Sequence, residues 1–153
     1  AYYQVSPWAL SWDDENYYMI GYDSLSGIVK HYRVDKMLNI RTIEEKRDGA
    51  DLFENFDMAL YSKETFGMYS GKNKTVFLRC SNKIANVIID RFGTNISFSN
   101  ITDTHFDIHV NVNTSPLFYA WIMSFGADIT ILAPSEIIDE YKALAHAGLD
   151  QYE

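Results

Sequence analysis

The sequence has only one cysteine, three prolines and four histidines among its 153 residues. A single cysteine, Cys80, cannot form an internal disulfide, so nothing in the composition suggests an oxidising compartment. No apolar run approaches the roughly 20 residues that span a bilayer, and no basic-then-apolar leader opens the sequence. We therefore expect a cytoplasmic protein without a membrane segment.

Positive charge is also scarce, because 13 Lys and Arg face 21 Asp and Glu for a net charge of −8. An acidic surface disfavours nonspecific binding of nucleic acid. Residues 25–47 are the exception, with six cations and three anions, whereas residues 48–153 carry seven cations and fourteen anions. An anionic ligand should bind the N-terminal third, although each of these cations taken alone could be an ordinary solvated strand-edge residue.

The hydrophobic fraction of 47% is typical of a globular chain of one domain or two small ones. The first 47 residues are rich in β-forming residues. We expect strands at residues 2–12, 17–22, 28–34 and 38–43, with a tight turn ending at Gly27. Four short antiparallel strands in so few residues predict a small SH3- or Sm-like β-barrel.

The alternation of residues predicts which side chains these strands display, because alternate positions share a face. Tyr18, Ile20 and Tyr22 share one face of their strand, while Ile28, Tyr32 and Val34 of the next strand should look inward. His31 and Arg33 then lie side by side outside. Lys30 falls with the inward set, so we expect it near an edge with its ammonium group in water. Tyr32 is assigned to the core, and for Tyr18 and Tyr22 both core and display remain open.

Residues 48–74 are predicted to form a connector. Its first half, residues 51–61, has apolar residues at helical spacing and acids at its start, which predicts an amphipathic helix. Residues 67–73 look like loop and imitate a P-loop. That motif is rejected because it has one residue too few between the glycines and no Ser or Thr for magnesium.

The last unit, residues 75–153, has the order β-α-β-β-α-β, which predicts a ferredoxin-like domain followed by a C-terminal helix. Ser81 and Asn82 should cap a helix that ends at Gly93, and Ser115-Pro116 should open another that ends at Gly126. The predicted strands are residues 75–80, 95–101, 104–112 and 128–132, and Pro134 should start the final helix.

Four residues, Asp103, His105, Asp107 and His109, alternate as a metal site might. In a strand the two histidines are about 13 Å apart, too far to share a zinc ion, so an exposed polar face is the better interpretation. No nucleophile with an adjacent base is found, and Cys80 ends an apolar strand. We therefore expect no enzyme, no metal and no cofactor.

An ordered series of short motifs resembles a known family. Pro7-Trp8-Ala9-Leu10, then Tyr17-Tyr18-Met19, then Tyr32-Arg33-Val34-Asp35-Lys36-Met37 are similar to the WYL domain of bacterial transcription regulators. The signature Trp and Leu of the tripeptide are replaced by Tyr17 and Met19. Downstream, residues 76–79, 121–126 and 131–134 resemble the extension that often follows such domains. The resemblance implies a WYL-like barrel at 1–47 lacking its first strand, a connector at 48–74 and the extension at 75–153, without the usual helix-turn-helix domain.

The resemblance further implies a sensor that binds single-stranded nucleic acid or a nucleotide-like effector. Guanidinium and ammonium groups would contact phosphate while bases stack on tyrosines. The expected contact residues are Tyr18, Tyr22, Lys30, His31, Arg33 and Lys36. A homodimer is expected, with DNA bound through a domain outside this chain. The alternatives are a dimerisation or interaction module without a small ligand, and an enzyme, which the missing catalytic constellation disfavours.

Overall fold

The computed structural model describes residues 2–66 and 71–152. The chain divides into two compact units, residues 1–70 and 71–153, and each is described by itself. Residues 67–70, which belong to the predicted loop and to the rejected P-loop-like motif, lie outside the described residues. Within the described ranges, no helix is long and apolar enough to cross a bilayer. The architecture is mixed α and β, as the sequence predicts.

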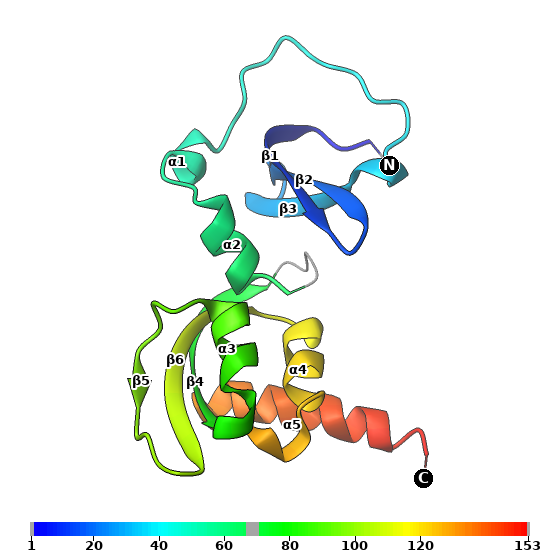
Figure 1. Ribbon diagram of the computed structural model, residues 1–153. Helices are drawn as coiled ribbons and strands as arrows, with labels where there is room; N and C mark the ends of the chain where they lie inside the picture. Colours follow the sequence, from blue (N-terminus) through cyan, green and yellow to red (C-terminus); the bar gives the residue numbers. More distant parts are fainter. Residues whose placement is uncertain (1, 67–70, 153) are drawn as a thin grey trace. The chain divides into compact units, whose positions relative to one another are not determined.

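The first unit is built on an antiparallel three-stranded sheet in the order β1-β2-β3 (Figure 1). The strands are β1 (Val5–Asp13), β2 (Asn16–Asp23) and β3 (Ile28–Arg33). Gly27, with a φ of 69°, completes the turn between β2 and β3, as expected for a residue without a Cβ. A bulge between Pro7 and Ala9 leaves Trp8 without a partner in the β1–β2 register.

The predicted fourth strand at residues 38–43 is wrong, and the three described strands do not close into a barrel. A 3₁₀ turn (Val34–Lys36) ends β3, and the chain continues as an irregular loop (Figure 1). Asn39 takes a left-handed φ of 56°, which interrupts an extended strand. Leu38 and Ile40 are 85% and 73% exposed, so the apolar pattern that predicted a strand is not buried within this unit.

The predicted single helix at residues 51–61 is instead two short helices, α1 (Ala50–Phe53) and α2 (Met58–Glu64). The break occurs because Asp57 adopts an extended conformation. Its side chain accepts hydrogen bonds from the backbone N–H groups of Ala59 and Leu60, at 2.8 and 3.1 Å. This carboxylate therefore caps α2 rather than continuing one helix.

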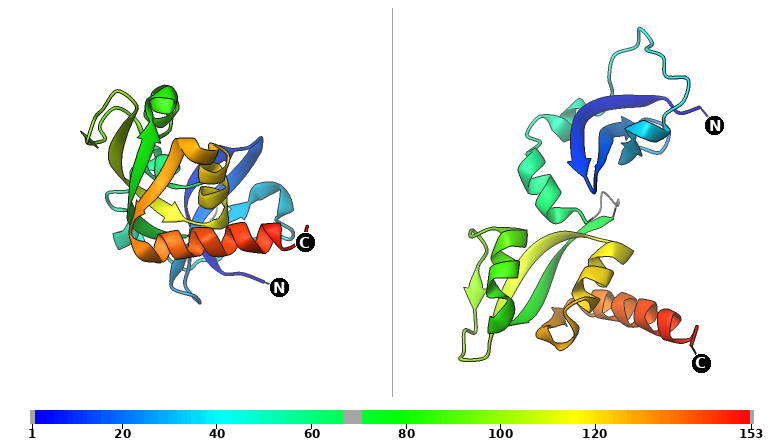
Figure 2. Two further views of the ribbon diagram at one scale, coloured as in Figure 1. Left: turned by 90° about the horizontal axis from the view of Figure 1, so that it is seen from below. Right: turned by 45° about the vertical axis from the view of Figure 1, so that its right-hand side comes forward.

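The second unit follows the predicted β-α-β-β-α-β order and ends in a long helix. Its elements are β4 (Lys72–Ser81), α3 (Ala85–Phe92), β5 (Phe98–Ser99), β6 (His105–Thr114), α4 (Pro116–Met123), β7 (Ile129–Ala133) and α5 (Ser135–Leu149). The four strands form one antiparallel sheet in the order β5-β6-β4-β7. Figure 2 shows the same elements from two further directions.

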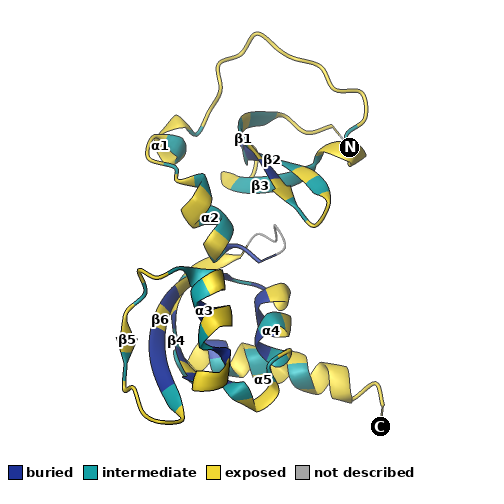
Figure 3. Cartoon of the chain, viewed as in Figure 1, coloured by how far each residue is buried: buried dark blue, intermediate teal, exposed yellow. Residues whose placement is uncertain are grey.

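The core of the second unit lies on one face of the central strands β4 and β6 (Figure 3). The buried even-numbered residues there are Val76, Leu78 and Cys80 of β4 and Phe106, Ile108, Val110 and Val112 of β6. Predicted capping residues set the helix limits around it. Ser81 accepts a hydrogen bond at the start of a 3₁₀ turn that leads into α3, and Gly93 follows the last residue of that helix. Ser115 caps α4, and Pro134 precedes α5. Burial of the even positions leaves the odd positions of both strands on the opposite face.

Candidate functional site

The register of the first sheet places four of the expected ligand residues on one face. Opposite residues of antiparallel strands share a face. Tyr18 lies opposite Arg33, Ile20 opposite His31, and Tyr22 opposite Val29. Tyr18, Tyr22, His31 and Arg33 therefore share a face. The alternation of residues predicted only that Tyr18 goes with Tyr22 and that His31 goes with Arg33.

That face is largely covered rather than displayed, which differs from the expected orientation. Ile20 is completely buried in its middle. The His31 Nε2 atom lies 2.7 Å from the hydroxyl of Tyr61 in α2. At the other end of the face, Gly49 is so close to Tyr22 that an added Cβ would lie 2.6 Å from the ring. Residues 49–61 pack on this face because Ile20 would otherwise be exposed to water.

A series of aromatic contacts holds residues 49–61 against the first sheet. These contacts were not predicted from the sequence. The Trp8 ring stacks on Phe53 with centroids 5.3 Å apart and planes 9° apart. The Arg47 guanidinium also lies over the Trp8 ring, 4.1 Å from its centroid. The Trp8 indole N–H also donates to the Asp48 carbonyl at 2.8 Å. Trp8 can make these contacts because the bulge in β1 takes it out of the strand register. No local sequence signal predicts that bulge.

Arg33 lies at the end of β3 in a partly exposed ion pair. Its Nε and Nη2 donate to the two oxygens of Asp35 at 3.0 and 2.8 Å, and Nη2 also donates to Asn16 at 2.7 Å. The Asp35 hydrogen bond raises the pKa of Arg33, and the same bond lowers the pKa of Asp35. The Arg33 side chain is 38% exposed, and no hydrogen bond among the described residues involves its Nη1. The guanidinium is therefore oriented by Asp35 and Asn16 through Nε and Nη2.

The two expected lysines are placed differently: Lys30 lies away from Arg33, whereas Lys36 pairs with the Asp35 carboxylate that Arg33 also contacts. Lys30 is on the opposite face, where it forms an ion pair with Asp23, and the Tyr32 hydroxyl donates to the same carboxylate at 3.3 Å. The Lys30 hydrogen bond is the main cause that lowers the pKa of Asp23 to about 2, while burial is the main cause that raises the pKa of Tyr32 to about 12. Lys36 lies in the 3₁₀ turn, 3.5 Å from Asp35.

The face of the first sheet that carries the Lys30–Asp23 pair also has an exposed apolar and aromatic part. Leu10, Trp12, Tyr17 and Ile28 are each at least half exposed there. The Trp12 and Tyr17 rings meet edge-on, with centroids 4.6 Å apart. Trp12 and Tyr17 are opposite in the register, and their exposure depends on which face residues 49–61 cover.

The odd-numbered face of the second sheet is polar. The Arg79 guanidinium donates twice to Asp107, at 2.8 and 2.9 Å, and His109 stacks on Phe77 with planes 4° apart. Asp107 and His109 are thus held by protein partners. Among the described residues, no three His, Cys, Asp or Glu side chains come together as a metal would require.

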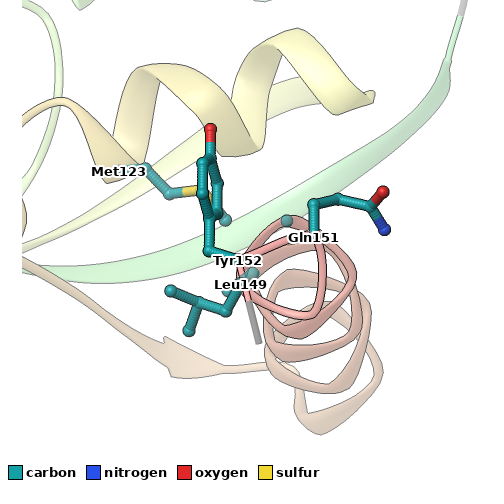
Figure 4. Close-up of a pocket in the computed structure, with 6 residues that line it drawn as sticks. Met123, Leu149, Gln151 and Tyr152 are labelled. Carbon is teal, nitrogen blue, oxygen red and sulfur yellow. The ribbon is translucent and has the colours of Figure 1, made fainter.

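The second unit also has an apolar hollow beside the end of α5. Met123, Leu149, Gln151 and Tyr152 contribute to its wall (Figure 4). Its lining contains no charged side chain, so it offers nothing to hold an anionic ligand.

Comparisons with known proteins match both units. Residues 2–42 match the WYL domain family, and residues 73–149, half of the chain, match the WCX domain family. No curated protein matches the sequence. Among solved structures, proteasome accessory factor B/C (PafBC) of Arthrobacter aurescens is similar over 99% of this chain, with 18% identity and a TM-score of 0.46. The chain spans 23% of the length of that protein.

Proposed function

The chain belongs to the WYL-domain family of transcription regulators, and we propose that it is the ligand-sensing part of a bacterial, cytoplasmic regulator. The proposed ligand is anionic and carries flat rings, as a single-stranded nucleic acid or a nucleotide-like effector does. Tyr18, Tyr22, Lys30, His31, Arg33 and Lys36 are the proposed contacts. The proposal includes no catalytic step. For the second unit we propose a ferredoxin-like arrangement, which its β-α-β-β-α-β order supports.

The observation that carries the proposal is the environment of Arg33. Asp35 and Asn16 hold Nε and Nη2 in a fixed plane, which orients the guanidinium before a ligand arrives. A phosphate can replace Asp35 as the anion of the bidentate pair. Tyr18 lies directly opposite Arg33 in the register, so a base stacked there is adjacent to the bound phosphate.

The remaining contacts on that face are available only if the covering segment moves. The Tyr61 hydroxyl already forms a hydrogen bond with His31, and the Gly49 backbone packs against the Tyr22 ring. Ligand binding that recruits these residues would therefore shift residues 49–61 away from the sheet. In a dimer, such a shift would alter the DNA affinity of a domain outside this chain.

The test is a titration of the chain with labelled short single-stranded DNA, single-stranded RNA and cyclic dinucleotides between about 50 and 200 mM salt. Replacing Arg33 by alanine removes one phosphate contact. For a single-stranded ligand, the slope of log K against log salt should become shallower by about 0.7. Arg33→Lys keeps the charge, so it should retain the slope but bind more weakly because the bidentate geometry is lost.

The matched control is Lys142→Ala, which removes one positive charge from an exposed position of α5. Its affinity and salt slope should equal those of the unmodified chain. Identical affinity and slope for Arg33→Ala would remove Arg33 from the site, and no binding of any of the three ligands would refute the proposal.

A second candidate function is supported by a specific observation. Lys30, Arg33 and Lys36 all have carboxylate partners within the first unit, as solvated structural ion pairs do. An interaction module without a small ligand predicts self-association that none of the three nucleotide ligands changes.

A further inference from the structure

Residues 49–61, here called the strap, cover the face of the first sheet that carries Tyr18, Tyr22, His31 and Arg33. The strap includes α1 and the first part of α2, helices of four and seven residues, and neither helix contains a buried residue. Helices that short are not stable in water without tertiary packing. The strap therefore depends on its contacts with the sheet to keep its structure.

The contacts that hold the strap form one series of rings. Phe53 stacks on Trp8, and Phe56 lies with its centroid 4.9 Å from the Phe53 ring and 4.9 Å from the Tyr61 ring. The Tyr61 hydroxyl then meets His31 in β3. The three rings of the strap are only half-buried. Contacts of this kind, close to water, open at a low cost in free energy.

The contact between Phe53 and Trp8 has the geometry that a bound nucleobase would adopt. Bases stack on aromatic side chains, and the Phe53 ring lies on Trp8 with planes 9° apart. The Arg47 guanidinium is 4.1 Å from the Trp8 centroid, so the phosphate of a base stacked on Trp8 would lie near a cation.

The chain just before the strap is tied to β1 without the help of these rings. The Arg47 guanidinium donates to the Pro7 carbonyl at 3.1 Å, and the Asp48 N–H donates to the Ser6 hydroxyl at 2.8 Å. Gly49 follows with a φ of 77°. The strap can therefore leave the sheet while Arg47 stays beside Trp8.

We propose that Trp8 and Arg47 are a further part of the ligand site, and that the strap closes this site by placing Phe53 where a nucleobase would stack. The inference rests on the proposed function and adds a ring-binding residue and a means of regulation to it. A base and Phe53 exclude one another on Trp8, so ligand binding and release of the strap are coupled. The apparent affinity of the free chain is then reduced to the fraction of chains that are open.

The first test is a titration with a labelled short single-stranded DNA at about 100 mM salt. Phe53→Ala should bind about threefold more tightly or better, because loss of the ring pair raises the open fraction. The matched control is Leu52→Ala, which shortens a 51% exposed side chain of the same helix and should leave the affinity unchanged. In the Phe53→Ala chain, Trp8→Leu should weaken binding about fivefold or more, because the base loses its stacking partner.

The second test is amide hydrogen exchange of the unmodified chain with and without saturating DNA. Exchange in α2 should become faster when DNA binds, because the released helix is too short to keep its hydrogen bonds. Amides of β4 and β6 in the second unit should keep their rates. This measurement needs no variant, so it does not depend on how well Phe53→Ala folds.

The outcomes separate this inference from the proposed function. DNA binding with α2 exchange that is unchanged or slower would overturn the strap and leave the function standing, as would a Phe53→Ala chain that binds no more tightly. An unchanged affinity on adding Trp8→Leu would remove Trp8 from the site. No binding by either the unmodified chain or Phe53→Ala would overturn both proposals.

Discussion

Asp107 provides a stability prediction whose size follows from the structure. Its side chain is completely buried in β6 and accepts hydrogen bonds from Arg79 and, at 2.7 Å, from Asn100. The Arg79 bonds are the main cause that lowers the pKa of Asp107 from 3.8 to about 2. Such a difference corresponds to about 2 kcal/mol of stability at neutral pH. Because the Arg79 side chain is 44% exposed, solvent screening reduces the expected value to about 1–2 kcal/mol.

The sign of the pH dependence follows from the lowered pKa. A carboxyl group that binds its proton less tightly in the folded state stabilises that state above its unfolded pKa. The contribution of Asp107 is therefore complete above about pH 4 and is lost as the pH falls through about 2. Asp107→Asn keeps the shape and removes the charge, so it should lower the free energy of unfolding at pH 7. The difference from the unmodified chain should close at the acid end.

The assay is urea unfolding followed by the fluorescence of Trp121, with Trp8 and Trp12 replaced by phenylalanine so that only the second unit is observed. Asp103→Asn, at an exposed position before β6, is the control and should leave stability unchanged. A loss for Asp107→Asn that is the same at pH 7 and at pH 2, or no loss at pH 7, would refute the reasoning.

Three further changes have defined outcomes. Gly49→Ala should destabilise the first unit by more than about 1 kcal/mol in urea unfolding followed by Trp8, because φ is +77° and the new Cβ meets the Tyr22 ring; an unchanged midpoint would contradict this. Ser115→Ala removes the cap of α4 and should lower the unfolding free energy of the second unit by about 1 kcal/mol, measured by Trp121 fluorescence. Tyr61→Phe keeps the ring but loses the hydrogen bond to His31, so amide hydrogen exchange in α2 should speed up. Equal exchange rates would show that this bond does not stabilise α2 against the sheet.

Local signals explain why the second unit could be predicted. Ser81, Ser115 and Pro134 each act on the backbone within a few residues, and so their effect can be read without knowledge of distant contacts. The alternation of apolar residues in β4 and β6 likewise gave the buried face, because helices cover one side of that sheet. The element order followed from these signals.

The first unit was harder because its exposure is decided by distant contacts. Alternation grouped Tyr18 with Tyr22 and His31 with Arg33, but it could not tell that residues 49–61 cover their common face through contacts such as Trp8 with Phe53. The strand predicted at 38–43 failed for the same reason, since an apolar pattern forms a strand only where a partner strand is available. The geometry of the ion pair between Arg33 and Asp35 could likewise come only from the structure.

The central claim is that a ligand phosphate binds the Arg33 guanidinium in competition with Asp35. Its most direct test is the affinity of the Asp35→Asn variant for the best of the three nucleotide ligands, measured beside the unmodified chain by isothermal titration. Removing the competing carboxylate should strengthen binding, with the gain lost in the double variant Arg33→Ala, Asp35→Asn. Equal or weaker binding by Asp35→Asn would contradict the account and would leave the Arg33–Asp35 pair as a purely structural contact.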